Sequence, residues 1–243
     1  MTVEMLAQAG CRAGPGGASV GGAGAAEAAD EHVERLLRGL RRRYSDRITG
    51  ELATPASAAR YADLPADMHP RLRQALAARG MERLYSHQRA AWDIARAGRH
   101  LVVATPTASG KTLCYNLPVL DAVLSEGAKA LYLFPTKALA QDQMAELSDL
   151  NRCGGAGAGA LGVKAFTFDG DTPGDARKAV RTRGDIVLSN PDMLHQAVLP
   201  HHTKWAQFFE SLAFIVVDEL HSYRCLLYTS PSPRDGTKDL VCR

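Results

Sequence analysis

Short apolar runs alternate with longer mixed segments through residues 100–218 of the chain. Five of these runs have the length and β-branched content of buried strands: HLVVAT, KALYLF, VKAFTF, DIVLSN and AFIVVD. A helical or loop segment separates each run from the next. Strands and helices that alternate in this way build a parallel sheet with helices packed on its faces. The pattern therefore predicts an α/β fold.

The N-terminal third of the chain carries a different pattern. Nine alanines and seven glycines make up more than half of residues 1–30. Such a stretch buries too little apolar surface to offset the entropy of ordering it, and we expect residues 1–29 to be disordered. From Asp30, a good N-cap, apolar residues follow helical spacing: Val33, Leu36, Leu37 and Leu40. We therefore interpret residues 30–82 as a helical and linker extension, whose arginines are more often a solvated face than a phosphate site.

The segment TPTASGKT follows the first predicted strand and opens a helix, which is the context of a phosphate-binding P-loop. Backbone N–H groups at the start of a helix surround a phosphate, and small residues leave room for it. Lys111 would reach the β- and γ-phosphates, and Thr112 would hold Mg²⁺. Thr105 stands where the general pattern has its first glycine. The residues predicted to line this ATP site are Thr107, Ala108, Ser109, Gly110, Lys111 and Thr112.

An acidic pair, Asp218 and Glu219, closes the last predicted strand. Asp218 is suited to hold Mg²⁺ through water, and Glu219 to orient and deprotonate the water that attacks the γ-phosphate. Alone, such a pair is more often an ordinary strand end. Its combination with the P-loop lysine favours ATP hydrolysis. We therefore predict a catalytic set of Lys111, Asp218 and Glu219, with Thr112 and Asp218 as the metal ligands.

Four motifs together resemble the first motor domain of superfamily 2 DEAD/DEAH-box helicases: TPTASGKT, FPTKALAQDQ, SNPDML and DELH. The segments FDGDT and VVDELHSYR are similar to the mitomycin-repair branch, which is related to RecQ-like helicases. The resemblance covers residues 60–224. It implies a RecA-like P-loop NTPase sheet flanked by helices, with residues 83–224 as a partial ATP-binding domain. It also implies a central strand between the P-loop strand and the acidic strand, and we expect the chain to be truncated before it.

The resemblance also assigns roles to single positions. It implies that Gln88 reads adenine and that His221 couples the nucleotide state to domain motion. Tyr85 is equally suited to stack on the base or to belong to the core. Three strand-to-helix loops resemble elements that bind nucleic-acid backbone phosphates, and they share one edge of a parallel sheet. Their residues are Pro135, Thr136 and Lys137; Gly170, Asp171 and Thr172; and Asn190, Pro191 and Asp192.

The last residues do not continue this pattern. The codons for residues 225–230 can be TGT CTC TTA TAC ACA TCT, and residues 231–235 and 239–243 continue the series in frame. That series matches the transposase end and adapter of a common short-read library. We therefore expect residues 225–243 to be a non-native, adapter-derived tail.

The resemblance implies a parent protein that couples ATP hydrolysis to translocation on DNA and unwinding of DNA, in a DNA-repair context. The fragment alone is expected to be inactive. The alternative is a nucleotide-regulated clamp or remodelling module that does not separate strands, because FPTKALAQDQ supports both equally. A small-molecule P-loop kinase would not explain SNPDML and DELH together. The choice of DNA over RNA comes from the resemblance alone, since backbone contacts carry no base information.

Composition adds little about the protein's partners and its cellular compartment. The formal net charge of +3 is too small to indicate a nucleic-acid partner by itself. The five cysteines show no close pairs and no metal-ligand spacing, which favours a reducing compartment. No signal peptide and no apolar run of membrane-spanning length is evident in the sequence. We therefore expect a cytoplasmic protein without a membrane partner.

Overall fold

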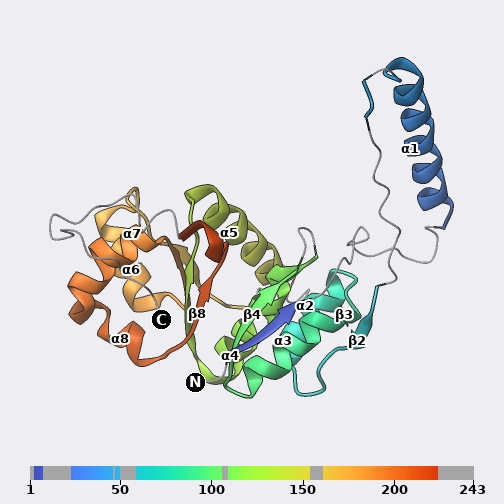
Figure 1. Ribbon diagram of the computed structural model, residues 1–243. Helices are drawn as coiled ribbons and strands as arrows, with labels where there is room; N and C mark the ends of the chain where they lie inside the picture. Colours follow the sequence, from blue (N-terminus) through green and yellow to red (C-terminus); the bar gives the residue numbers. More distant parts are fainter. Residues whose placement is uncertain are drawn as a thin grey trace. The chain divides into compact units, whose positions relative to one another are not determined.

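The computed structural model describes residues 3–7, 23–45, 47–49, 59–105, 109–153 and 161–223. The chain divides into two compact units, Met1–Pro118 and Val119–Arg243. Figure 1 shows the order of the helices and strands along the chain. The expected adapter-derived tail, residues 225–243, lies outside the described residues.

The first unit contains two small sheets. β1 (Val3–Ala7) pairs in parallel with β4 (His100–Ala104), and β2 (Tyr61–Asp63) pairs in antiparallel register with β3 (Arg83–Tyr85). The helices are α1 (Ala23–Arg43), α2 (Pro70–Ala78), α3 (Ser86–Arg96) and the start of α4 (Lys111–Glu126). The buried apolar side chains of α2, β3 and α3 are Leu72, Ala75, Leu76, Leu84, Ala91, Trp92 and Ile94.

The structure differs from the expected disorder at two places in the N-terminal stretch. α1 begins at Ala23 rather than at Asp30, because residues 23–29 contain five alanines, the strongest helix formers. Val3–Ala7 forms β1, which pairs residue for residue with β4. A strand edge offers unpaired N–H and C=O groups to any extended segment, and local composition does not reveal such a distant partner. Residues 8–22 are outside the part that the structure describes.

The second unit is built on a parallel sheet in the order β6-β7-β5-β8. Its strands are β5 (Lys129–Leu133), β6 (Ala165–Thr167), β7 (Ile186–Ser189) and β8 (Leu212–Val217). These correspond to four of the five predicted strands, and the parallel α/β sheet is confirmed. β7 is buried along its whole length, which suits a strand with neighbours on both sides.

Helices flank this sheet (Figure 1). They are α5 (Lys137–Arg152), α6 (Gly174–Arg183), α7 (Pro191–Met193), the π-helix η1 (Leu194–Val198), the 3₁₀ helix η2 (Leu199–Trp205), α8 (Ala206–Glu210) and the 3₁₀ turn η3 (Leu220–Ser222). Trp205 at the end of η2 packs edge-to-face on Phe168 and Phe208, with ring centroids 4.9 and 5.6 Å away. None of the described helices is long and apolar enough to cross a membrane.

β8 is the terminal strand of its sheet, and its inner neighbour is β5. Side chains along β8 alternate between half-buried and exposed. Among the exposed ones, Ile215 has 61% and Val217 41% of its surface accessible. β4, the strand that leads into the predicted P-loop, belongs instead to the two-stranded sheet with β1. The P-loop strand and the acidic strand therefore belong to separate sheets of the described structure.

Candidate nucleotide and nucleic-acid sites

The predicted P-loop connects β4 to α4. Pro106, Thr107 and Ala108 lie outside the described residues, so the structure describes the loop on either side of them. The hydroxyl oxygens of Thr105 and Ser109 lie 2.6 Å apart, and Lys111 Nζ donates to Thr105 O over 2.9 Å. Thr105, which replaces the usual first glycine, thus contributes both its hydroxyl and its carbonyl to the loop.

Gly110 is required by two features of the loop. Its φ is +77°, a conformation that side chains disfavour, and a Cβ at this position would lie 2.7 Å from Gln88 Nε2. The Gln88 carboxamide can therefore lie against the backbone of residue 110 only because glycine has no side chain. The helix α4 starts at the next residue, so its first N–H groups and Lys111 are presented where an anion is favoured.

The first turn of α3 holds two consecutive P-loop carbonyls. His87 Nε2 lies 3.0 Å from Ser109 O, and Gln88 Nε2 donates to Gly110 O over 3.0 Å. A carbonyl only accepts, so His87 carries its proton on Nε2. Both side chains are almost completely buried. Burial lowers the pKa of His87, and the hydrogen bond to Ser109 opposes that shift only partly.

Gln88 also caps the helix on which it stands. Its Oε1 accepts the N–H of Tyr85 over 2.9 Å, so the carboxamide bonds to backbone at both ends. The predicted adenine contact of Gln88 stays a prediction. The Tyr85 ring stacks on Tyr61 and on His87, with centroids 5.2 and 5.7 Å away. This stack of protein rings favours the packing role of Tyr85 over the base-stacking role.

The acidic motif follows β8 directly. Asp218 N–H donates to Leu133 O over 3.1 Å, and Asp218 Oδ1 accepts the N–H of Glu219 over 2.9 Å. Glu219 Oε2 lies 3.3 Å from His221 Nδ1, and the His221 side chain is 80% exposed. The predicted coupling role of His221 is not tested by this pairing, but the contact joins it to the predicted base.

Glu219 has an unusual backbone. Its φ of 49° and ψ of 45° are left-handed, and within the described residues it is the single non-glycine with positive φ. Such a conformation costs about 1–3 kcal/mol and persists only where the surroundings hold it. Tyr223 is one of those surroundings, because its hydroxyl donates to Leu133 O over 2.9 Å. Tyr223 is not among the site residues predicted from the sequence.

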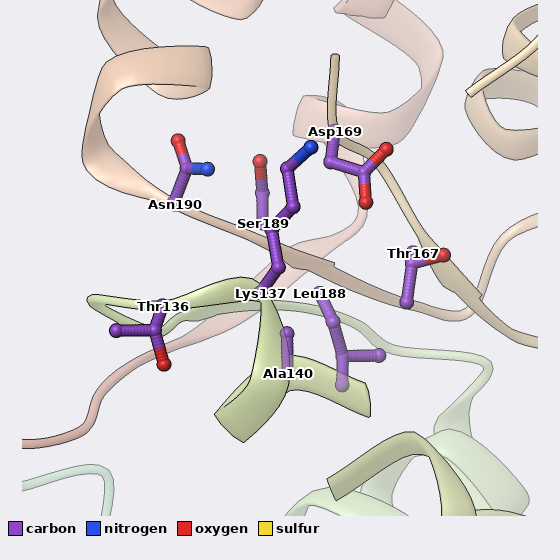
Figure 2. Close-up of a pocket in the computed structure, with 8 residues that line it drawn as sticks. All are labelled: Thr136, Lys137, Ala140, Thr167, Asp169, Leu188, Ser189 and Asn190. Atoms are coloured by element: carbon purple, nitrogen blue, oxygen red, sulfur yellow. The ribbon is translucent and has the colours of Figure 1, made fainter. Parts of the chain in front are cut away.

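One pocket in the second unit is lined by three of the predicted loop residues, Thr136, Lys137 and Asn190 (Figure 2). The remaining loop contributes Asp169 and not the predicted Gly170, Asp171 and Thr172. Thr136 and Asn190 each cap the helix that follows, with Oγ1 accepting Leu139 N–H over 3.3 Å and Oδ1 accepting Met193 N–H over 2.8 Å. The side chains are therefore oriented by the helix starts. The pocket is lined by Thr136, Lys137, Ala140, Thr167, Asp169, Leu188, Ser189 and Asn190.

Two of the predicted loop residues form an ion pair across the loops. Lys137 Nζ lies 2.5 Å from Asp171 Oδ2. The hydrogen bond to Asp171 raises the pKa of Lys137, and the same bond lowers the pKa of Asp171. The carboxylate of Asp171 is thus paired with Lys137, and the predicted nucleic-acid contact of Asp171 stays a prediction.

The DGDT loop is held by an arginine that was not predicted as a site residue. Arg177 Nε donates to Thr172 O over 2.9 Å, and its second nitrogen donates to Gly170 O over 3.4 Å. The guanidinium lies 5.6 Å from the centroid of the Phe168 ring. The sequence does contain a signal for this contact. Arg177 lies one turn into the helix that follows the glycine-containing loop, and the donors of a guanidinium suit exposed loop carbonyls.

The sequence model of the DEAD/DEAH box helicase family matches residues 85–226, more than half of the chain. The chain is 52% identical over 162 residues to the uncharacterized ATP-dependent helicase YprA of Bacillus subtilis, covering 66% of this chain and 21% of that protein. It is 39% identical over 171 residues to the ATP-dependent helicase hrq1 of Schizosaccharomyces pombe, covering 70% and 16%.

Among solved structures, the chain is similar to the DUF1998 helicase MrfA bound to DNA and AMPPNP. The identity is 50% and the TM-score 0.65, over 69% of this chain and 23% of that one. The chain thus spans 16 to 23% of the length of these three proteins. These similarities confirm the resemblance that the motifs indicated, including its mitomycin-repair-like branch. The chain belongs to the DEAD/DEAH box helicase family.

Proposed function

We propose that the protein containing this chain is an ATP-dependent helicase that translocates on DNA and separates its strands, in a DNA-repair context. The observation that carries the proposal is that residues of three strand-to-helix loops line one pocket, in the same unit as an acidic motif whose glutamate has a constrained backbone. The 50% identity to a helicase solved with DNA and AMPPNP supports DNA and ATP as the ligands.

In this proposal the P-loop binds the ATP phosphates. Gly110 N–H and the first N–H groups of α4 would contact the β-phosphate, and the Lys111 ammonium would exchange Thr105 O for the β- and γ-phosphates. The Thr112 hydroxyl and the Asp218 carboxylate are oxygen ligands of the kind that Mg²⁺ prefers. The described residues contain no cluster of three or more His, Cys, Asp or Glu, which suits an ion held largely by phosphates and water. When bound, Mg²⁺ would supply positive charge to the phosphates.

Glu219 would act as the general base. Its carboxylate would accept a proton from the attacking water, whose oxygen bonds to the γ-phosphorus as the bond to ADP breaks. Glu219 Oε2 lies 3.3 Å from His221 Nδ1, so proton uptake would change the contact with the predicted coupling residue. His221 would in this way report hydrolysis to the rest of the motor.

The pocket of the second unit would bind the backbone of one strand. Thr136 lies at the N-terminus of α5, where N–H groups favour a phosphate, and Lys137 adds a cation. The Asn190 side chain lies at the start of the short helix α7. Such contacts place the strand without reading its bases. A shift of grip between successive nucleotide states would then move the protein along the strand.

The test uses the full-length protein that carries this chain. A forked DNA duplex and a matched RNA duplex are offered with Mg²⁺ and ATP, and strand separation and phosphate release are measured together. We expect nucleic-acid-stimulated hydrolysis and separation of the DNA duplex, both lost in Glu219→Gln while nucleotide binding persists. Lys111→Ala should lose nucleotide binding as well. Stimulated hydrolysis without strand separation would instead indicate a clamp or remodelling module, and separation of RNA alone would refute the DNA assignment.

A further inference from the structure

The loop that carries Asp218 and Glu219 is closed at both ends on one backbone atom. Leu133 O accepts the N–H of Asp218 over 3.1 Å and the hydroxyl of Tyr223 over 2.9 Å. A carbonyl oxygen has two lone pairs and can accept both. The acidic loop is therefore attached to the end of β5 at its first and last residues.

The bonds inside this loop hold the left-handed backbone of Glu219. Glu219 N–H donates to Asp218 Oδ1 over 2.9 Å, and Ser222 N–H donates to Glu219 O over 2.8 Å. Both bonds are local, and each spans at most three residues. The Tyr223 hydroxyl adds a bond to a different strand, so it fixes the loop relative to the sheet.

The Tyr223 hydroxyl acts as the hydrogen-bond donor to Leu133 O. The acceptor is a carbonyl, so the hydroxyl must donate. Burial of the half-buried ring raises the pKa of Tyr223 to about 12, and the negative charge of Asp218 adds to the shift. The hydroxyl therefore keeps its proton at any pH at which the protein would operate.

Leu133 also leads into the nucleic-acid pocket. The next residue, Phe134, donates its N–H to Ser189 O over 2.9 Å, and Thr136 then caps α5. Ser189 and Thr136 both line the pocket. Leu133 O, which anchors the acidic loop, is thus one residue before Phe134. The hydrogen bond from Phe134 N–H to Ser189 O joins the strand that leads to Thr136 to the strand that leads to Asn190.

We propose that Tyr223 is a positioning residue, whose hydroxyl holds Glu219 in the conformation needed to activate water and ties it to the strand that enters the nucleic-acid pocket. The inference rests on the proposed function for its effect on turnover. Its structural part, that the hydroxyl restrains the acidic loop, stands independently of that function.

The first test measures turnover in the full-length protein. Tyr223→Phe removes the hydroxyl alone, and we expect DNA-stimulated kcat to fall about three- to ten-fold, the effect of losing one hydrogen bond, with the KM for ATP unchanged. Para-aminophenylalanine at position 223 keeps a donor and should restore turnover. In a Glu219→Gln background, Tyr223→Phe should have no further effect. Tyr44→Phe, which changes a tyrosine far from these motifs in sequence, is the matched control.

The second test needs no turnover. Hydrogen exchange of the peptide covering residues 218–223 should be faster in Tyr223→Phe than in the wild type, with exchange in α5 unchanged. Equal exchange would overturn the inference whether or not the protein hydrolyses ATP. A kcat within two-fold of the wild type would also overturn it. Absence of stimulated hydrolysis in the wild type would refute the proposed function, and the exchange result would still decide the role of Tyr223.

Discussion

Replacing Gly110 by alanine tests how closely α3 holds the P-loop. The φ of Gly110 is +77°, and a Cβ there would lie 2.7 Å from Gln88 Nε2. Gly98 is a matched control, because its φ is +69° and nothing lies within 4 Å of its Cβ position. Comparing the two variants separates the cost of the backbone conformation from the cost of displacing Gln88.

The two losses of stability should differ. The left-handed conformation costs an L-residue about 1–2 kcal/mol, so Gly98→Ala should lower the free energy of unfolding by about that amount. Gly110→Ala has the same cost and also displaces the carboxamide of Gln88, which bonds to Gly110 O and to Tyr85 N–H. Leaving such buried groups unpaired adds about 1–3 kcal/mol. The total expected for Gly110→Ala is therefore about 2–5 kcal/mol.

Urea unfolding followed by tryptophan fluorescence in a Trp205→Phe background, which leaves the buried Trp92 of α3 as the reporter, measures these losses. A cycle with Gln88→Ala is the decisive control, because the shortened side chain removes the clash and the double variant should lose less than the sum of the single ones. Equal losses for Gly98→Ala and Gly110→Ala, or additive losses in the cycle, would refute the reasoning. The same variants in the full-length protein should weaken nucleotide binding in the same order.

Three further predictions concern the pocket, the contact of His87 with the P-loop, and the sheet. Asp171→Asn should tighten binding to single-stranded DNA by releasing Lys137, whereas Lys137→Ala should weaken it. Lys137→Ala should also make the negative slope of log affinity against log salt shallower by about 0.7. Fluorescence anisotropy at several salt concentrations measures both the affinities and the slope. Because burial lowers the pKa of His87 below 6.5, the folded state binds a proton more weakly than the unfolded state. The free energy of unfolding should therefore fall as the pH drops below 6.5, and His87→Asn should remove that part of a pH series. Ser189→Ala deletes a buried hydroxyl that donates to Phe168 O over 2.7 Å, and urea unfolding should show a loss of about 1–3 kcal/mol, with Ser189→Thr close to the wild type.

Much of the second unit was predictable because its information is local. The apolar runs that became β5 to β8 are short and β-branched, and the polar residues that follow them necessarily meet at one edge of a parallel sheet. The pocket of the three loops follows from that rule. The ion pair of Lys137 with Asp171 does not follow from the order of the strands, because it joins two loops that are 34 residues apart in sequence. A motif identifies loop residues but not the side chains that they contact.

The features that were not predicted depend on contacts between distant segments. β1 arises from pairing with β4 across more than ninety residues, within a stretch whose composition indicates disorder. Gln88 has an ordinary position near a helix start, and only the structure shows that its carboxamide lies on the P-loop. The backbone of Glu219 is left-handed although glutamate disfavours that region, because the surrounding bonds hold it. Backbone strain of this kind leaves no compositional signal.

The exposed edge of β8 has a practical consequence for anyone who purifies the chain. Within the described residues β8 has a strand neighbour on one side only, and Ile215 and Val217 are exposed. Such an edge is a template on which another copy can add its own strand. Purified material should therefore form larger species as its concentration rises. Light scattering across a dilution series would show this behaviour.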